Sequence, residues 1–422
     1  MRVLLLADDC NPDWPSLPAV GYKTCKAIGE KIDAVVATHV RNKPAIARDG
    51  MGRCEVEYID NEYIARPMFR LSLFLRGGNK VAWTTSLAMR YLPYLAFERE
   101  VWRRFKGELK AGRFDVVHRL TPMSPALPSP MAKWSPAPFV IGPLNGGLKW
   151  PPGFARTIWR EKEWITYLRG AYKLLPFRRA TNANSAAILA AFPHTIADLP
   201  ERTHDRVINF PEVGIDPELF SAPPARSPRD RMTILYAGRL VSYKCPDVLL
   251  MALAARPELR QHRVLIVGDG PERPLMDQIV RENGLEQSVE FTGSVSQARV
   301  GEIMREADIF VFPSIRELGA GVVVEAMACG LACVVVDYGA PGRLVGSEYG
   351  VRVPLAGKDQ LVAQFSTELA ALVKDPARVR ALGAAARDHA LRSYTWDTKA
   401  RQIVEVYQWV LRQRADKPAF DY

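Results

Sequence analysis

Short apolar runs alternate along this chain with longer amphipathic segments, and this alternation is typical of α/β proteins built on parallel sheets. Turn-forming residues follow the runs, so each run is expected to form a buried strand. The expected strands of the first half are 3–6, 34–38, 116–118 and 139–141, and those of the second half are 233–236, 264–267, 289–291, 309–311 and 333–336. The pattern therefore predicts an α/β fold with two doubly wound, Rossmann-like units.

The chain has 422 residues, which is too many for one compact core and fits two or three domains. The segment 221–231, SAPPARSPRDR, is rich in proline, serine and charge, so it is expected to be a linker. The predicted domains are 1–220 and 232–395, and residues 396–422 are expected to form a C-terminal helix that packs back toward the N-terminal domain. Two such domains are expected to face each other across a cleft that holds a ligand.

Composition excludes several other classes of protein. Hydrophobic residues make up 48% of the chain and charged residues 24%, which excludes a disordered, collagen-like or coiled-coil chain. No apolar run reaches the roughly 18 residues of a membrane span, and the N-terminus, MRVLLLADD, is too short for a signal peptide. From these two observations we expect a cytoplasmic protein. The six cysteines show no CxxC pair, so we expect reduced thiols and no metal site.

The positive charge is concentrated in one segment. The net charge is +11, and residues 101–180 contain fifteen Lys and Arg against four acids. A basic helix with an apolar stripe is expected at 154–177. Such a helix fits the inner surface of an anionic membrane, and a core-packed helix with a solvated basic face is an equally good interpretation. We expect no nucleic-acid partner, since only this charge would favour one.

The first candidate site follows the strand 233–236. Gly238 stands at the strand exit, and Arg239 and Lys244 are five residues apart. Loops at the carboxyl ends of parallel strands form the ligand edge of such a sheet, so both cations could reach one diphosphate there. Taken alone this signal is weak, because a Gly-Arg pair is common.

A more specific segment, PSIRELGAGVVVEAMACGLACVVVDYGAPG, follows the strand 309–311. Glu317 lies in the loop, and Glu325 lies eight residues later on the expected helix. The small residues 319–321 between them would let backbone N–H groups approach a ligand at the helix N-terminus, which favours an anion. Two carboxylates beside such a site suit a sugar nucleotide, and a glycine-rich turn with a capping Glu is the simpler alternative.

These motifs, together with GRLVSYK (238–244), VGDGPER (267–273) and FTGSV (291–295), resemble the donor lobe of the family 4 retaining glycosyltransferases, which have the GT-B fold. The resemblance covers 238–342, and the first lobe matches more loosely. It implies that Arg239 and Lys244 hold the donor diphosphate, that Glu325 binds the ribose hydroxyls and that Glu317 contacts the transferred sugar. The remaining donor-binding positions that it implies are Gly238, Leu318, Gly319, Ala320 and Gly321.

The resemblance also implies roles in the first lobe. His118 follows the strand FDVVH, where the family often has a histidine that faces the donor sugar, so a catalytic role is expected for it. Gly21 stands where the family has a Gly-Gly pair facing the phosphate, although Pro18 and Ala19 precede it here. The loop GPLNGG, with Asn145 and Gly146, is a candidate phosphate or acceptor loop, and an ordinary turn fits it equally well. A further departure is Leu318, where the family commonly has glycine.

The function implied is transfer of a sugar, with retention, from a UDP- or GDP-sugar to an acceptor hydroxyl in glycolipid or cell-surface polysaccharide synthesis. No D-x-D motif is present, so no metal is expected, and the cations would balance the leaving group. Transfer to a soluble small molecule and a GT-B nucleotide-sugar epimerase are alternatives. A dinucleotide-dependent oxidoreductase is not expected, because GDGPER lacks the third glycine of its motif.

Overall fold

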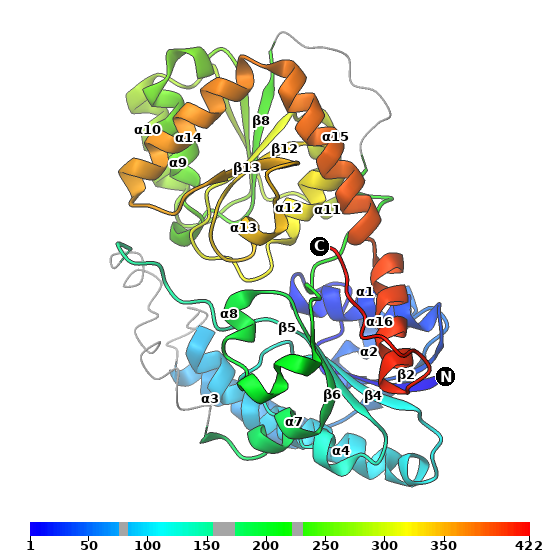
Figure 1. Cartoon of the computed structure of the whole chain (residues 1–422). Coiled ribbons are helices and arrows are strands. Elements are labelled where there is room, and N and C mark those ends of the chain that lie inside the picture. The colour runs from blue at the N-terminus through cyan, green and yellow to red at the C-terminus, as the bar shows by residue number, and fades with distance from the viewer. Residues whose placement is uncertain (76–82, 155–173, 222–230) are drawn as a thin grey trace. The chain divides into compact units, whose positions relative to one another are not determined.

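The structure, a computed structural model, describes residues 1–75, 83–154, 174–221 and 231–422. The chain divides into two compact units, each with one parallel sheet and its own helices (Figure 1). Unit 1 comprises Met1–Gly147, Glu161–Glu212 and Trp396–Tyr422. Unit 2 comprises Leu148–Arg160 and Val213–Thr395.

Unit 1 contains a seven-stranded parallel sheet of order β3-β2-β1-β4-β5-β6-β7, with its switch of direction between β1 and β4. Its strands are β1 (Arg2–Ala7), β2 (Asp33–His39), β3 (Glu55–Ile59), β4 (Val116–Thr121), β5 (Phe139–Leu144), β6 (Ser185–Ala190) and β7 (Val207–Ile208). Its helices are α1 (Leu17–Gly29), α2 (Lys43–Asp49), α3 (Glu62–Leu75), α4 (Trp83–Lys110), α5 (Met131–Trp134), α7 (Arg178–Asn184), α8 (Pro193–Ile196) and α16 (Trp396–Val410).

Strand β1 is buried on both faces, as a central strand of a doubly wound sheet must be. Val3, Leu5 and Ala7 face one core, to which α1 and α16 contribute. Leu4 and Leu6 face a second core, to which α4 contributes. Strand β1 is apolar at every position from Val3 to Ala7 because helices cover both faces of the sheet.

The C-terminal helix α16 belongs to unit 1. It packs against α1, and Ile403, Val406 and Tyr407 are fully buried in the same core as β1. An ion pair between Lys31 and Asp397 joins the end of α1 to the start of α16. The chain therefore returns from unit 2 to unit 1 at Trp396.

Unit 2 contains a six-stranded parallel sheet of order β10-β9-β8-β11-β12-β13. Helices α9, α10 and α14 pack together on one side of this sheet, and α12 packs with α15 on the other (Figure 1). The strands are β8 (Thr233–Ala237), β9 (Arg263–Val267), β10 (Val289–Gly293), β11 (Ile309–Phe312), β12 (Ala332–Val336) and β13 (Gly350–Val353). The helices are α9 (Pro246–Ala255), α10 (Arg273–Asn283), α11 (Gln297–Glu306), α12 (Gly321–Ala328), α13 (Pro341–Leu344), α14 (Lys358–Val373) and α15 (Pro376–Ser393).

Two of the expected boundaries differ from those observed. The first domain was expected to end at 220, but Val213–Phe220 lies in unit 2, where Ile215 N–H donates to the Tyr394 carbonyl (2.9 Å). The segment that begins at Leu148 also belongs to unit 2. Most of the expected linker, 222–230, and most of the expected basic helix, 155–173, lie outside the described residues. Among the described residues, no helix is both long and apolar enough to cross a bilayer.

Glycines allow the loops after β8 and β9 to pack backbone against backbone. A Cβ on Gly268 would lie 2.1 Å from the Gly238 carbonyl oxygen, and a Cβ on Gly270 would lie 2.4 Å from the Leu240 carbonyl oxygen. The Leu240 N–H donates to the Asp269 carbonyl (2.9 Å), and the Leu240 carbonyl accepts from the Glu272 N–H (3.0 Å). The glycines of VGDGPER thus hold the β8 loop in place, which fixes the backbone around Arg239.

This packing predicts that Gly268→Ala lowers the melting temperature of unit 2 by about 5 °C or more, because its Cβ would displace the Gly238 backbone. Thermal unfolding followed by circular dichroism measures the effect. Gly107→Ala is the control, because a Cβ there meets no atom within 4 Å in helix α4. Equal melting temperatures for wild type and Gly268→Ala would contradict the close approach.

Candidate functional site

The candidate site lies at the carboxyl edge of the unit 2 sheet, after the neighbouring strands β8 and β11. The loop after β8 carries Gly238, Arg239 and Lys244, and the loop after β11 carries Glu317. Parallel pairing brings both loops to one edge, so residues about seventy positions apart in sequence become neighbours.

An ion pair between Lys244 and Glu317 forms the centre of the site. The two side chains are only 12% and 14% exposed, so water screens the pair poorly. The Lys244 ammonium also lies 4.9 Å from the centre of the Phe312 ring. The sequence predicted a functional role for both residues, and the structure brings them into direct contact.

Backbone hydrogen bonds hold the two loops in register. The Tyr243 carbonyl accepts from the Ile315 N–H (2.9 Å) and lies 3.2 Å from the Ser314 hydroxyl oxygen. Ser314 Oγ also lies 3.3 Å from Glu317 Oε1, to which it donates. The Glu317 carboxylate is therefore oriented by one charged and one neutral donor.

Arg239 lies at the exposed rim of the same site. Its guanidinium donates to the Tyr243 hydroxyl (2.8 Å), and its backbone carbonyl accepts from the Tyr236 hydroxyl (3.2 Å). Tyr243 thus links the two predicted cations, since the Lys244 ammonium lies 5.9 Å from the centre of the Tyr243 ring. Arg239 and Lys244 could both reach one anion at this edge.

The predicted anion-binding turn leads into helix α12. Ala320 adopts a left-handed conformation (φ 51°) directly before the first helical residue, Gly321. A Cβ on Gly321 would meet only Val213 Cγ1, at 3.9 Å, so the backbone here has open space beside it. Leu318 and Gly319 are half-buried in the same turn. The first N–H groups of α12 carry the positive end of the helix dipole, which favours an anion.

Glu325 lies one turn further along α12 and has different surroundings from Glu317. Its Oε1 accepts from the side-chain amide of Gln297, at the start of α11 (3.2 Å). Glu317 and Glu325 therefore lie at different places along this edge, Glu317 beside Lys244 and Glu325 beside α11. This separation agrees with the different roles that the resemblance implies for them.

The structure contradicts the catalytic role expected for His118. Strand β4 continues to Thr121, so His118 lies in mid-strand and is fully buried. Its Nε2 donates to the Gly142 carbonyl (2.7 Å), and its Nδ1 accepts from the Tyr407 hydroxyl of α16 (2.6 Å). Burial lowers the pKa of His118 to about 3, so the ring is neutral. With both nitrogens bonded inside unit 1, His118 cannot contact a sugar and instead joins β4 to α16.

The structure gives packing roles to the first-lobe loop residues. A Cβ on Gly21, in helix α1, would lie 2.4 Å from the Asp9 carbonyl oxygen, so Gly21 allows the helix to approach the loop after β1 closely. The Gly146 N–H donates to the Thr195 hydroxyl (3.2 Å). Asn145 is buried, and its side-chain amide donates to Glu212. For Asn145 and Gly146, these contacts fit the ordinary turn that the sequence analysis gave as an equally good interpretation.

At the carboxyl edge of unit 1, the sequence prediction missed an acidic pair and its arginine. Asp8 and Asp9 follow β1, and Arg90 of α4 forms ion pairs with both carboxylates. Burial and the charge of Asp9 raise the pKa of Asp8 to about 7, against the opposing effect of Arg90. The signal available in sequence was two consecutive acids at the end of a buried strand, which is the ligand edge of such a sheet.

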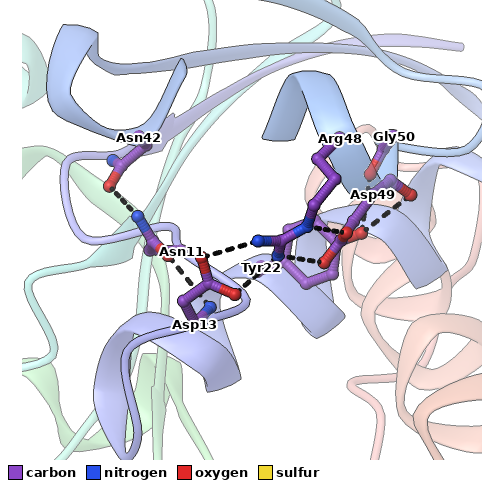
Figure 2. Close-up of polar contacts among 7 residues, drawn as sticks. All are labelled: Asn11, Asp13, Tyr22, Asn42, Arg48, Asp49 and Gly50. Atoms are coloured by element: carbon purple, nitrogen blue, oxygen red, sulfur yellow. Dashed lines mark hydrogen bonds and ion pairs between the residues drawn. The ribbon is translucent and has the colours of Figure 1, made fainter. Parts of the chain in front are cut away.

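The loop after β1 is held by polar contacts, shown in Figure 2. Arg48 binds Asp13 (3.2 Å for one pair of atoms) and Asp49 (2.6 Å). The Asn11 side-chain amide donates to Asn42 (3.2 Å), whose own amide donates to the Asp8 carbonyl (2.9 Å). This loop lacks the Gly-Gly pair of the family, and side-chain contacts fix its shape instead.

Comparison with known proteins supports the assignment of unit 2. Residues 221–389 match the family model described as "Glycosyl transferases group 1". This match covers less than half of the chain, and it shows that unit 2 is similar to the group 1 glycosyltransferases. The D-inositol 3-phosphate glycosyltransferase of Thermobispora bispora is 33% identical over 197 residues, which are 44% of this chain and 45% of that protein. The chain thus spans about half the length of the curated relatives it matches.

Solved structures show the fold of the whole chain. Anabaena HepE in complex with UDP has a TM-score of 0.62 at 17% identity, over 97% of this chain and 100% of that one. Sucrose-phosphate synthase from Thermosynechococcus elongatus has a TM-score of 0.61 at 18% identity, over 98% and 100%. The predicted GT-B class, with two parallel-sheet α/β units, is confirmed.

The burial of His118 predicts a pH-dependent stability that His118→Gln removes. Because the folded pKa lies below the ordinary value of 6.5, the unfolded chain alone takes up a proton as the pH falls from 6.5 toward 3. The free energy of unfolding should then fall by up to about 1.4 kcal/mol per pH unit from this residue alone. Thermal unfolding at pH 7.5 and pH 5 should show a smaller loss for His118→Gln than for wild type.

His204→Gln, which alters an exposed histidine, is the matched control and should keep the wild-type pH dependence. Turnover of His118→Gln should stay within a few-fold of wild type at pH 7.5. A collapse of turnover without a change in stability would restore the catalytic role.

Proposed function

We propose that this protein is a retaining glycosyltransferase that moves a sugar from a nucleoside-diphosphate sugar to an acceptor hydroxyl. The observation that carries the proposal is the Lys244–Glu317 pair beside the N-terminus of α12, with Arg239 at the rim. This edge offers two cations and helix amides for a diphosphate, and two carboxylates for hydroxyls.

The main requirement for catalysis is to stabilise the negative charge that develops on the leaving diphosphate. As the bond from the anomeric carbon to the diphosphate breaks, negative charge grows on the leaving oxygen, and Lys244 and Arg239 stabilise it. Glu317 holds Lys244 from the other side, so the ammonium is already in place before the donor binds. Bond formation to the acceptor oxygen on the same face gives retention, and the acceptor proton passes to the departing diphosphate.

The two carboxylates take separate roles in this proposal. Glu317 accepts hydrogen bonds from the sugar, because it lies beside the cation that holds the diphosphate. Glu325 accepts from the ribose hydroxyls, since it lies further along α12 next to Gln297. The donor proposed is a UDP- or GDP-sugar, and Anabaena HepE, which shares the fold, has been solved with UDP. With these cations the reaction requires no metal, so activity should survive excess EDTA.

The acceptor is proposed to bind unit 1, where Asp8, Asp9 and Arg90 line the sheet edge. Carboxylates that accept from hydroxyls suit a glycan or lipid-linked sugar, in glycolipid or cell-surface polysaccharide synthesis. The name of the Thermobispora relative, D-inositol 3-phosphate glycosyltransferase, favours a second candidate, a soluble small-molecule acceptor. Transfer assays with a lipid-linked sugar and with inositol 3-phosphate distinguish the two.

Lys244→Ala and Glu317→Gln should each lower turnover by on the order of a hundredfold or more, because the first removes a preorganised cation and the second removes the negative charge that holds this cation in place. Steady-state transfer of radiolabelled sugar, with the donor chosen by thermal shift among UDP-, GDP- and ADP-sugars, measures the loss. Lys374→Ala, at a 69% exposed lysine of unit 2, is the matched control. Near-normal turnover in Lys244→Ala would overturn the donor-site assignment.

Glu325→Ala should act differently and raise the donor KM more than it lowers kcat, since ribose contacts are alike in ground and transition states. The same assay, run over a range of donor concentrations, separates the two constants. A collapsed kcat at an unchanged donor KM would contradict the ribose role.

Peripheral association with an anionic inner membrane surface is proposed as well, and α3 supports it. Tyr63, Phe69 and Leu71 on this helix are 58%, 55% and 45% exposed, and Arg66 and Arg70 are exposed beside them. Exposed apolar side chains next to cations suit the headgroup region of anionic lipid. This helix is a stronger basis for the proposal than the expected helix 154–177, most of which lies outside the described residues.

Cosedimentation with vesicles tests the membrane proposal. Binding to phosphatidylglycerol vesicles should exceed binding to phosphatidylcholine vesicles and weaken with salt, and Phe69→Ala/Leu71→Ala should reduce it several-fold. Trp14→Ala, which removes an exposed aromatic side chain from the loop after β1, is the control. Equal, negligible binding to both vesicle types at low salt would leave the soluble acceptor as the better candidate.

A further inference from the structure

The segment 148–154 follows β5 and its loop but belongs to unit 2, where it lies against the candidate donor site. We infer that Trp150 of this segment is a positioning residue for donor binding, which acts through Tyr243 and Arg316. The inference rests on the proposed function and deepens it, because it adds a residue from the first half of the chain to the donor site.

The backbone of the segment is fixed against the loop after β12. The Tyr338 hydroxyl donates to the Lys149 carbonyl (2.7 Å). A Cβ on Gly339 would lie 3.0 Å from Leu148 Cδ2 and 2.6 Å from the Glu317 carbonyl oxygen. Gly339 is therefore enclosed by the segment and by the backbone of Glu317, and the segment starts from a fixed position beside the site.

The Trp150 ring makes two contacts with side chains of the site loops. The Arg316 guanidinium carbon lies 4.6 Å from its ring centre, within the range of a cation–π interaction. The Tyr243 ring meets it edge to face, with centres 6.5 Å apart and planes at 86°. The segment thus touches the loops after β8, β11 and β12, which are consecutive in the sheet.

Both contacts lead directly to groups proposed to bind the donor. Tyr243 accepts from Arg239 through its hydroxyl and holds the loop after β11 through its carbonyl. Arg316 immediately precedes Glu317. A ring that fixes Tyr243 and Arg316 therefore fixes Arg239 from one side and the Glu317 backbone from the other.

Fixing Arg316 also has an electrostatic reason. Its positive charge lies next to Glu317 in the loop after β11, and a guanidinium that left the indole face could compete with Lys244 for the Glu317 carboxylate. The face of an indole ring offers the guanidinium an alternative partner. Side chains that are already held in place cost less conformational entropy to order when the ligand binds. Trp150 should therefore strengthen donor binding without touching the donor.

The test compares Trp150→Phe with Trp150→Leu. Phenylalanine keeps an aromatic face for Arg316, whereas leucine keeps apolar bulk but has no such face. Lys149→Ala is the control, because Lys149 contributes its backbone carbonyl to the anchor and its side chain is exposed. Titration calorimetry with UDP and with GDP measures the Kd, and steady-state transfer measures the donor KM and kcat.

Trp150→Leu should raise the nucleoside-diphosphate Kd and the donor KM about tenfold, and Trp150→Phe should stay within about threefold of wild type. Lys149→Ala should match wild type. A wild-type Kd in Trp150→Leu, or the same loss in Phe and Leu variants of unchanged melting temperature, would overturn the inference. Lys244→Ala separates this failure from that of the proposed function. If Lys244→Ala binds the nucleotide as tightly as wild type, or if wild type binds neither nucleotide, both proposals fall. If Lys244→Ala binds more weakly while Trp150→Leu binds like wild type, only the inference about Trp150 falls.

Discussion

Parallel pairing of β8, β11 and β12 determines where everything else in unit 2 can lie, because it brings the carboxyl ends of three strands to one edge. The loops that leave this edge have little room. Gly238, Gly268 and Gly270 let the loops after β8 and β9 meet through their backbones, and Tyr243 bonds the loop after β8 to the loop after β11. The charged side chains therefore project from backbone that is already fixed, which is the condition for a preorganised site.

The Lys244–Glu317 pair shows why the backbone of these loops must be fixed. Two charges that are each less than one-sixth exposed lose much of their hydration, and the attraction between them compensates only when the geometry is held. Ser314, Phe312 and the backbone of Tyr243 hold it. An anion that arrives at Lys244 meets a cation that is positioned but still balanced by a carboxylate. The Lys244–Glu317 pair is therefore proposed to act in donor binding. Its geometry is held by neutral groups of unit 2 that pack around it.

The sequence allowed much of unit 2 to be predicted, because its signals are local. Apolar runs marked five of its six strands, and β13 was missed because GVRV begins with glycine and alternates with a charge. The motif residues Lys244 and Glu317 were found, but their ion pair was not, since contact between loops depends on strand order. In unit 1, β3 was missed because glutamates interrupt it, and His118 was misassigned because β4 runs three residues further than its apolar run. Trp150 gave no local signal, because its partners lie about ninety and one hundred and sixty residues away along the chain.

The central claim is that the carboxyl edge of unit 2 holds the diphosphate of a nucleotide sugar. A crystal structure of the protein with the nucleoside diphosphate that most raises its melting temperature tests this most directly. The account predicts diphosphate oxygens within hydrogen-bonding distance of Lys244 Nζ, the Arg239 guanidinium and the first N–H groups of α12, with the ribose near Glu325. A nucleotide bound at another edge, or bound here with Lys244 still paired only to Glu317 and remote from the phosphates, would contradict it.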